Sequence, residues 1–165
     1  MFYRITLRST YLAVNFFKPL VCDIPMMQNL VESEVQSGTI LHRTEDEMAT
    51  TIRSYTAVSV DGQLAGFCAL HIHSIALAEI RSLIVGDQYR GKNLGKKLVE
   101  SSLEEAKSIG IKRVLSLTYQ EDFFKRLGFD VIEKESIPEH KIWADCVRCK
   151  HFPICDEIAL MYTIQ

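Results

Sequence analysis

The stretch from residue 79 to residue 97 most constrains what this chain can fold into. Residues 80–85 form an apolar run rich in β-branched side chains, which ends at Gly86 and is followed by a short polar loop. Gly91 and Gly95 then bracket the start of a long amphipathic helix. A strand that leads through a tight loop into a helix leaves several backbone N–H groups without partners, and the helix dipole favours negative charge there. This order of elements therefore predicts an anion-binding site.

Four basic side chains lie around the start of this helix: Arg90, Lys92, Lys96 and Lys97. Cations are disfavoured at the positive end of a helix dipole by roughly 0.3–1 kcal/mol each. Their presence is explained if a polyanion binds there. A solvated basic turn is the alternative, because lysines are mostly exposed in folded proteins.

Composition places few other limits on function. At 165 residues, with 47% apolar and 24% charged residues, the chain fits one soluble globular domain that buries a core. A net charge of −2 argues against a general nucleic-acid binder. No apolar run approaches the roughly 18 residues that span a bilayer. We therefore expect a cytoplasmic protein without a nucleic-acid or membrane partner, and a homodimer stays open.

The N-terminal segment has no secretory signal pattern. The first acidic residue is Asp23, and the basic and hydroxyl residues before it faintly resemble an organelle transit segment. Residues 4–8 also alternate like an edge strand. We therefore expect residues 1–13 to be a leader or an extra edge strand, and residues 14–165 to be the domain.

Local signals predict a single α+β domain. Asp23 followed by Pro25 is typical of a helix start. Residues 44–47 form a capping box, and residues 61–62 are an Asp-Gly hairpin turn. Strands are expected at residues 14–17, 54–60, 63–73, 75–85, 111–118, 129–134 and 157–164. Helices are expected from Asp23 to Gly38, from Thr44, at 93–109 and at 120–127.

This order of elements, with the motif Gln-Tyr-Arg-Gly-Lys-Asn-Leu-Gly-Lys at residues 88–96, resembles the GCN5-related N-acetyltransferase (GNAT) superfamily. The resemblance covers nearly everything from residue 14 onward. Five stretches more narrowly resemble the short N-acetylglutamate-synthase-like acetyltransferases of bacterial arginine biosynthesis: residues 69–72, 78–83, 117–120, 123–129 and 143–157. The resemblance implies an α/β/α fold, with a mixed, mostly antiparallel central sheet that is splayed at the cofactor site and has helices on both faces.

The resemblance also implies an acetyl-CoA site. The backbone of Leu83, Ile84 and Val85 would pair with the pantetheine arm of the cosubstrate. The pyrophosphate would be held by the loop and first helical turn, residues Arg90, Gly91, Lys92, Asn93, Leu94, Gly95 and Lys96. Asn93 replaces a usual glycine of the superfamily pattern Arg-x-x-Gly-x-Gly. Because asparagine tolerates a left-handed backbone better than other non-glycine residues, we expect the site to be retained.

Acetyl transfer to an amine needs a base that removes the ammonium proton, directly or through water. By resemblance to the synthases, Glu79 is the candidate base. Glu79 and Arg81 lie two apart on a strand and share a face, so an ion pair between them is the alternative. His71 and His73 are alternative bases, or structural histidines.

The coenzyme A thiolate must finally be protonated, and by resemblance Thr118 assists this step. Many superfamily members have a tyrosine acid where this chain has Phe124, whose ring cannot donate a proton and is expected only to contact the cofactor. Thr118, Tyr119 or water is then the donor, or no protein donor is needed.

An amino-acid substrate has carboxylates that arginine binds in a bidentate manner. Arg43, Arg81 and Ser82 are the candidate substrate-binding residues, whereas the C-terminal Arg-x-Ser contacts of the synthases have no clear match. The resemblance thus implies an acetyl-CoA-dependent N-acetyltransferase for a small amino acid, with L-glutamate as the expected acceptor. A protein or polyamine acceptor is the first alternative. A non-catalytic acyl-CoA-binding or metal-stabilised module is the second.

A cysteine-rich segment, residues 143–156, interrupts the C-terminal region. Cys146, Cys149 and Cys155, with His151 between them, could complete a structural zinc site, although their spacing is tighter than in common zinc modules. Reduced or redox-labile thiols and an iron–sulfur cluster are the alternatives. The two other cysteines, Cys22 and Cys68, lie in apolar surroundings and are expected in the core.

Overall fold

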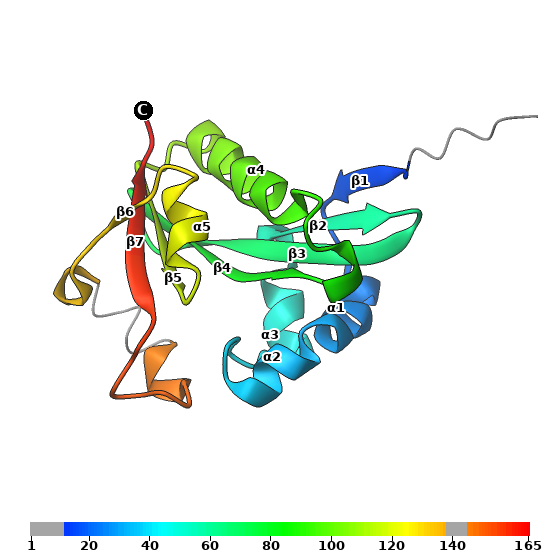
Figure 1. The fold of residues 1–165 in the computed structure, drawn as a ribbon, viewed down its shortest axis with the longest axis horizontal. Helices are drawn as coiled ribbons and strands as arrows, with labels where there is room; N and C mark the ends of the chain where they lie inside the picture. The colour runs from blue at the N-terminus through cyan, green and yellow to red at the C-terminus, as the bar shows by residue number, and fades with distance from the viewer. Residues whose placement is uncertain (1–11, 138–144) are drawn as a thin grey trace, which may run out of the picture.

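A single mixed sheet organises the computed structural model, which describes residues 12–137 and 145–165 (Figure 1). Within those ranges the strand order is β1-β2-β3-β4-β5-β7-β6. The strands are β1 Val14–Phe17, β2 Tyr55–Val60, β3 Gln63–Ile72, β4 Leu77–Val85, β5 Arg113–Thr118, β6 Asp130–Val131 and β7 Ile158–Thr163. Neighbouring strands pair antiparallel except β4 and β5, which are parallel. The expected mixed, mostly antiparallel sheet is confirmed.

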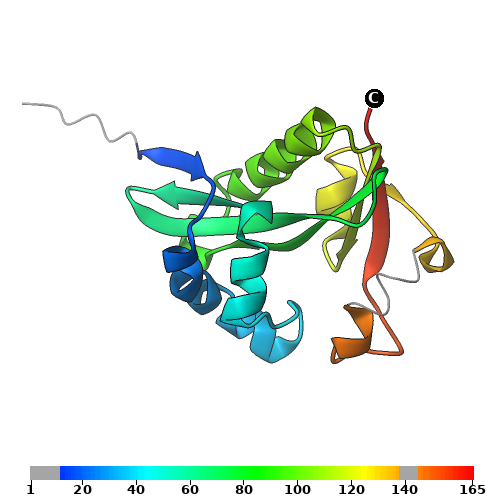
Figure 2. The same cartoon turned by 180° about the vertical axis from the view of Figure 1, so that it is seen from behind.

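Helices cover both faces of the sheet, as expected (Figures 1 and 2). The helices are α1 Ile24–Leu30, α2 Glu32–Ser37, α3 Glu45–Thr50, α4 Leu94–Ser108 and α5 Glu121–Lys125. On one face, α1 and α3 bury Ile24, Met27 and Met48 against the strands. On the other face, α4 and α5 bury residues such as Leu98 and Phe124. The site described below lies where the sheet between these two layers opens.

Two elements differ from the sequence prediction. The single helix expected between Asp23 and Gly38 is divided at Val31, which has φ −102° and ψ 4° and turns its side chain into the core. The expected strand at residues 129–134 is reduced to β6, because the chain turns into a short 3-10 helix, Lys134–Ser136. Both changes follow from tertiary packing that local propensity does not report.

The register between β3 and β4 contains a β-bulge that changes which residues face which layer. Phe67 pairs with Ile84 and Ala69 pairs with Arg81, so β4 has one more residue than β3 between these pairs. Ser82 accommodates the extra residue with φ 54°, in the left-handed region. Bulges re-aim side chains and are common next to active sites. Here the bulge places Arg81 and Ile84 on the same face, which α1 and α3 cover.

The sheet splays between its two parallel strands, as the family resemblance implied. The ladder between β4 and β5 joins Leu77 to Arg113, Ala78 to Val114 and Glu79 to Leu115, and it ends there. Both strands continue beyond this point, β4 to Val85 and β5 to Thr118. Their facing backbone edges are therefore available to another chain or ligand.

Some expectations fall outside the described residues, namely a leader or strand at residues 1–11 and the start of the cysteine-rich segment at residues 143–144. Within the described part, no helix is both long and apolar enough to cross a membrane.

Candidate active site

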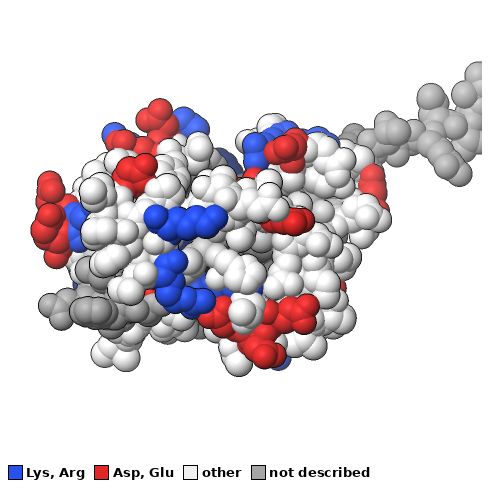
Figure 3. Space-filling view, turned by 90° about the horizontal axis from the view of Figure 1, so that it is seen from below, with Lys and Arg blue, Asp and Glu red and all other residues white. Residues whose placement is uncertain are grey.

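A cleft of about 630 Å³ lies between the diverging ends of β4 and β5. Its walls are residues 80–85 of β4, residues 116–120 at the end of β5, the start of α4 and the aromatic side chains of α5. Four cations line it: Arg81, Arg90, Lys96 and Arg126. Figure 3 shows lysine and arginine side chains near the middle of one face, with acidic side chains around them on the same face. The cleft thus joins a backbone edge to these cations, and Glu34 and Glu157 also belong to its lining.

The first turn of α4 lines one end of this cleft. Asn93, which precedes the helix, has φ 60° and ψ 15°, and its side chain makes no capping hydrogen bond. Asparagine therefore takes the left-handed conformation expected of it here. The first backbone bond of the helix runs from the N–H of Lys97 to the carbonyl of Asn93. The N–H groups of Leu94, Gly95 and Lys96 come before that bond and point out of the helix end, where an anion is favoured.

The basic side chains around this turn pair with exposed acidic side chains, and Arg90 Nε also donates to the carbonyl of Val85 at 3.2 Å. Arg90 Nη2 lies 3.0 Å from Asp87 and 3.7 Å from Glu34, and 58% of its side chain is exposed. Lys96 Nζ lies 3.7 Å from Glu100. Exposed ion pairs contribute about 0–1 kcal/mol, so a bound polyanion can outcompete them. Lys92 instead lies over the ring of Tyr89, 5.6 Å from its centroid.

Glu79 is buried at the last pair of the β4–β5 ladder, with 2% of its surface exposed. It pairs directly with His71 across β3 and β4, and therefore faces the α1–α3 layer. Its Oε2 lies 2.9 Å from Nε2 of His73. The alternative ion pair with Arg81 is not formed, because Arg81 turns to Asp145 and His71. Glu79 is not among the residues that line the cleft.

His71 of β3 and His73, which follows the strand, have different partners and hence different chemistry. Nδ1 of His71 accepts a hydrogen bond from Nη2 of Arg81 at 3.0 Å. Burial, together with the charges of Arg81 and His73, lowers the pKa of His71 to about 4. His71 is therefore neutral at pH 7 and a weak base. The rings of His71 and His73 meet edge to face, with their centroids 4.8 Å apart.

Arg43 and Arg81 share one buried carboxylate, that of Asp145. Asp145 Oδ2 accepts from Nη1 of Arg81 at 2.9 Å, and Oδ1 is paired with Nη2 of Arg43. Only 7% of the Asp145 side chain is exposed, against 16% for Arg43 and 14% for Arg81. The sequence analysis missed Asp145, which lies in a stretch quoted for the family resemblance. Nothing in its local sequence shows that it contacts residues 64 and 102 positions earlier.

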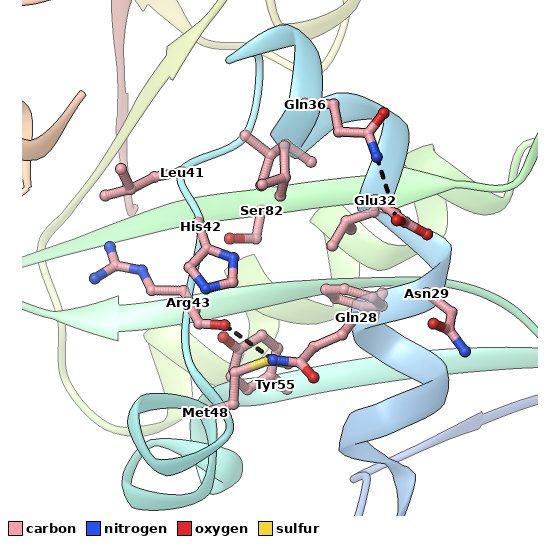
Figure 4. A pocket seen from close by; sticks show the side chains of 14 residues that line it. Gln28, Asn29, Glu32, Gln36, Leu41, His42, Arg43, Met48, Tyr55 and Ser82 are labelled. Carbon is pink, nitrogen blue, oxygen red and sulfur yellow. Dashed lines mark hydrogen bonds between the residues drawn. The ribbon is translucent and has the colours of Figure 1, made fainter. Parts of the chain in front are cut away.

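A second cavity, of about 380 Å³, adjoins the cleft (Figure 4). Figure 4 shows Ser82 between the loop that carries Arg43 and the helix that carries Gln36. Ile40 and Ser82 line both cavities, whereas Arg43 lines only the second and Arg81 only the first. The three residues predicted to bind substrate therefore surround the junction of the two cavities.

The end of β5 supplies the polar groups opposite β4. Thr118 lines the cleft, and its Oγ1 accepts from the N–H of Gln120 at 2.9 Å. The hydroxyl of Tyr119 donates to Asp156 at 2.8 Å. Desolvation and this bond raise the pKa of Tyr119 above its ordinary value. Tyr119 is therefore a weaker proton donor than an ordinary tyrosine. Phe124 lines the cleft but is 3% exposed and packs edge to face against Phe129.

The possible zinc ligands of the cysteine-rich segment are not gathered into a metal site in the part of the chain that the structure describes. Among residues 12–137 and 145–165, no group of three or more histidine, cysteine, aspartate or glutamate side chains is placed to hold a metal ion. Cys155 Sγ lies 3.8 Å from Glu157 Oε2, and burial raises the pKa of its thiol. Nδ1 of His151 lies 3.8 Å from Asp156 instead. Among the described residues, no disulfide joins Cys146, Cys149 and Cys155.

The other two cysteines differ in burial. Cys68 is fully buried, with its sulfur 3.2 Å from the hydroxyl of Ser102, and burial raises its pKa to about 11. Cys22 is exposed, so its expected core position is wrong. It lies in the 3-10 turn before α1, and the helix turns Ile24 and Met27 to the core instead.

A sequence model of the acetyltransferase (GNAT) family matches residues 24–129, which include both cavities' strands and the start of α4. The chain belongs to this acyltransferase family. An uncharacterized N-acetyltransferase of Chlorobaculum tepidum is 36% identical over 144 residues, which cover 87% of this GNAT chain and 92% of that relative.

Two further relatives are longer than this GNAT protein. An amino-acid acetyltransferase of Aeromonas salmonicida is 30% identical over 118 residues, which cover 70% of this chain and 27% of the relative. The structure of N-acetylglutamate synthase from Neisseria gonorrhoeae, complexed with coenzyme A and N-acetyl-glutamate, superposes with a TM-score of 0.83 at 23% identity. That match covers 93% of this chain and 35% of the synthase, and it shows the GNAT fold.

Proposed function

We propose that this protein transfers the acetyl group of acetyl-CoA to the α-amine of a small amino acid, with L-glutamate as the favoured acceptor. The observation that carries the proposal is the divergence of β4 and β5 beyond Glu79. It opens a cleft that begins at the N-terminus of α4 and ends at the partly buried Arg81, beside the second cavity that Arg43 lines. One end thus suits a diphosphate and the other a carboxylate.

The cleft fits acetyl-CoA as cosubstrate. The edge of β4 at Leu83, Ile84 and Val85, which does not pair with β5, would pair with the amide groups of the pantetheine arm, as an added strand pairs with a sheet edge; the Val85 carbonyl, which accepts from Arg90 Nε at 3.2 Å, would exchange that bond for one to the ligand. The pyrophosphate would bind the amides and cations of residues 90–96. Phe124 would contact the cofactor from α5. The coenzyme A in the Neisseria gonorrhoeae complex supports this assignment.

In the proposed reaction, the neutral amine attacks the thioester carbonyl, and the C–S bond then breaks. The ammonium proton goes to Glu79, and because Glu79 does not line the cleft, it travels through water. The departing thiolate takes a proton from the hydroxyl of Thr118 or from solvent through it. The products are the N-acetylated amino acid and coenzyme A.

In this proposal, the positive charges of Arg43 and Arg81 position the acceptor through its carboxylate. Arg43, Arg81 and Ser82 surround the junction of the cleft and the second cavity, so a carboxylate bound there would hold its α-amine beside the thioester. The names of the Aeromonas salmonicida and Neisseria gonorrhoeae relatives support an amino-acid acceptor. A polyamine is disfavoured, because its positive charges would meet two partly buried guanidinium groups.

The test measures thiol release from acetyl-CoA with a panel of free amino acids. We expect glutamate to be acetylated, and Glu79→Gln to lower kcat about 100-fold or more with little change in the KM for acetyl-CoA. Glu104→Gln, on the exposed side of α4, is the matched control and should keep full activity. Coenzyme A binding without turnover on any amine would instead support a non-catalytic module. A peptide that outperforms every free amino acid would change the acceptor class.

A further inference from the structure

We infer that Arg148 and Lys150 are positioning residues for the acceptor. They attach the cysteine-rich segment to the ends of α2 and α3, beside the second cavity. The attached segment carries Asp145, which contacts Arg43 and Arg81. The inference rests on the proposed amino-acid acetyltransferase function.

Glu47 of α3 connects the segment to the backbone beside Arg43. Its Oε2 accepts from the N–H of Thr44 at 2.8 Å, as part of the capping box, and its Oε1 accepts from Nη1 of Arg148 at 2.7 Å. The bond from Arg148 is the largest cause that lowers the pKa of Glu47 to about 2. Glu47 is therefore ionised at neutral pH, and one carboxylate joins the segment to the start of α3.

The peptide group between Arg43 and Thr44 is held at both of its polar atoms. Glu47 accepts from its N–H, and Nε2 of Gln28 in α1 donates to its carbonyl at 3.0 Å. The long side chain of Arg43 extends from this fixed point to Asp145. Holding a flexible side chain in place before the substrate arrives reduces the entropy lost on binding.

Lys150 makes the second attachment, at the C-terminal end of α2. Its Nζ donates to the carbonyls of Val35 and Gln36, at 3.2 and 2.9 Å. A cation is favoured there by the helix dipole and the unpaired carbonyls. Val35 and Gln36 line the second cavity. Gly38, just after the helix, lies so close that an added Cβ would be 3.2 Å from Cδ of Lys150.

A short turn connects these attachments to the two arginines. The backbone N–H of Arg148 donates to the carbonyl of Asp145 at 3.0 Å, at the 3-10 helix Cys146–Arg148. A displacement of Arg148 would therefore move Asp145, and with it the guanidinium groups of Arg43 and Arg81. A guanidinium has five N–H donors, more than these contacts use, so both arginines can also bind an acceptor carboxylate.

Removing the attachments should weaken acceptor binding and leave the cosubstrate site unchanged. We expect Arg148→Gln to raise the KM for glutamate about three- to fivefold, because the ion pair with Glu47 is partly exposed. Arg148→Gln combined with Lys150→Gln should raise it about tenfold or more. The KM for acetyl-CoA and kcat should change less than about twofold, because neither residue lines the cleft.

Three further variants separate positioning from general stability. Glu47→Gln removes the charge that binds Arg148 but keeps an oxygen that can cap α3, so it should raise the KM for glutamate as much as Arg148→Gln does. Arg148→Lys keeps the charge and should stay within about twofold of the unmodified protein. Lys18→Gln is the matched control, because Lys18 forms an ion pair of similar length and exposure, at 2.6 Å from Glu105 of α4.

The KM for glutamate decides the outcome, with thermal unfolding measured for each variant. A KM that rises in Arg148→Gln and Glu47→Gln, but not in Arg148→Lys or Lys18→Gln, supports the inference. If the unmodified protein acetylates glutamate and these variants lose only kcat or thermal stability, the inference alone is overturned, because the segment then only supports the fold. If the unmodified protein acetylates no amino acid, the proposed function fails and the inference fails with it.

Discussion

Two histidines separated by one residue show how strongly local partners decide chemistry. His71 is in β3 and His73 follows directly after the strand ends at Ile72, and in the sequence the two were equivalent as candidate bases. In the structure, Arg81 donates to His71, whereas His73 contacts Glu79 with both side chains only 3% exposed. A carboxylate this deeply buried needs a hydrogen-bonded partner to remain charged. His73 therefore has the position of a residue that orients the proposed base.

Replacing each histidine separates these roles. We expect His73→Gln to lower kcat about tenfold or more, because Glu79 loses the hydrogen-bonded partner that orients it. His71→Gln should change kcat less than about threefold, since His71 contacts Arg81 and is already neutral. The measurement is kcat and KM for the acceptor at neutral pH. An equal loss of kcat in both variants would contradict this assignment.

At the scale of elements, the turn into α4 depends on a backbone conformation that glycine adopts without strain. Asn93 holds φ 60° without capping the helix, and Gly91 before it has φ 77°. The conformation aims the amides of the first turn into the cleft. Asparagine can adopt this left-handed conformation, which explains why it can replace the glycine of the family pattern in this chain.

Substitutions at this turn test the cofactor site independently of the acceptor. Asn93→Gly restores the common family residue, and we expect it to leave the KM for acetyl-CoA unchanged or lower. Asn93→Val places a β-branched residue in the left-handed region, at a cost of roughly 1–2 kcal/mol. The KM for acetyl-CoA should then rise about five- to thirtyfold, with the KM for the acceptor little changed. Equal KM values for acetyl-CoA in both variants would show that these amides do not hold the diphosphate.

The elements that could be predicted from the sequence have local signals at their ends. The capping box of Thr44 forms with both of its bonds, and the turn at residues 61–62 joins β2 to β3 as expected. The break at Val31 and the shortness of β6 could not be predicted, because packing and pairing partners far along the chain cause them. The same reason hid Asp145, whose role depends on Arg43 and Arg81.

At the scale of the whole molecule, the site is made by segments that are distant in sequence. The turn before α3, the bulged strand β4 and the cysteine-rich segment meet at Arg43, Arg81 and Asp145. Within the described residues, the contacts that hold this segment include an ion pair from Arg148 to Glu47 of α3 and hydrogen bonds from Lys150 to the backbone at the end of α2. The catalytic and cofactor roles of individual residues stay predictions.

The stability of the whole fold should also respond to His71. Its pKa in the folded protein is about 4, below its ordinary value near 6.5, so the unfolded chain binds more protons between these values. The contribution of neutral His71 to the free energy of unfolding is then fully present above about pH 6.5, and it is lost as the pH drops toward 4. We expect this part of the loss to be on the order of 1 kcal/mol, because the half-buried ring is partly screened by solvent. Urea unfolding of the unmodified protein and His71→Gln at pH 7.5 and 4.5 measures it, and the variant should lose less stability on acidification. Equal losses in both proteins would mean that His71 takes up its proton as readily in the folded state as in the unfolded chain.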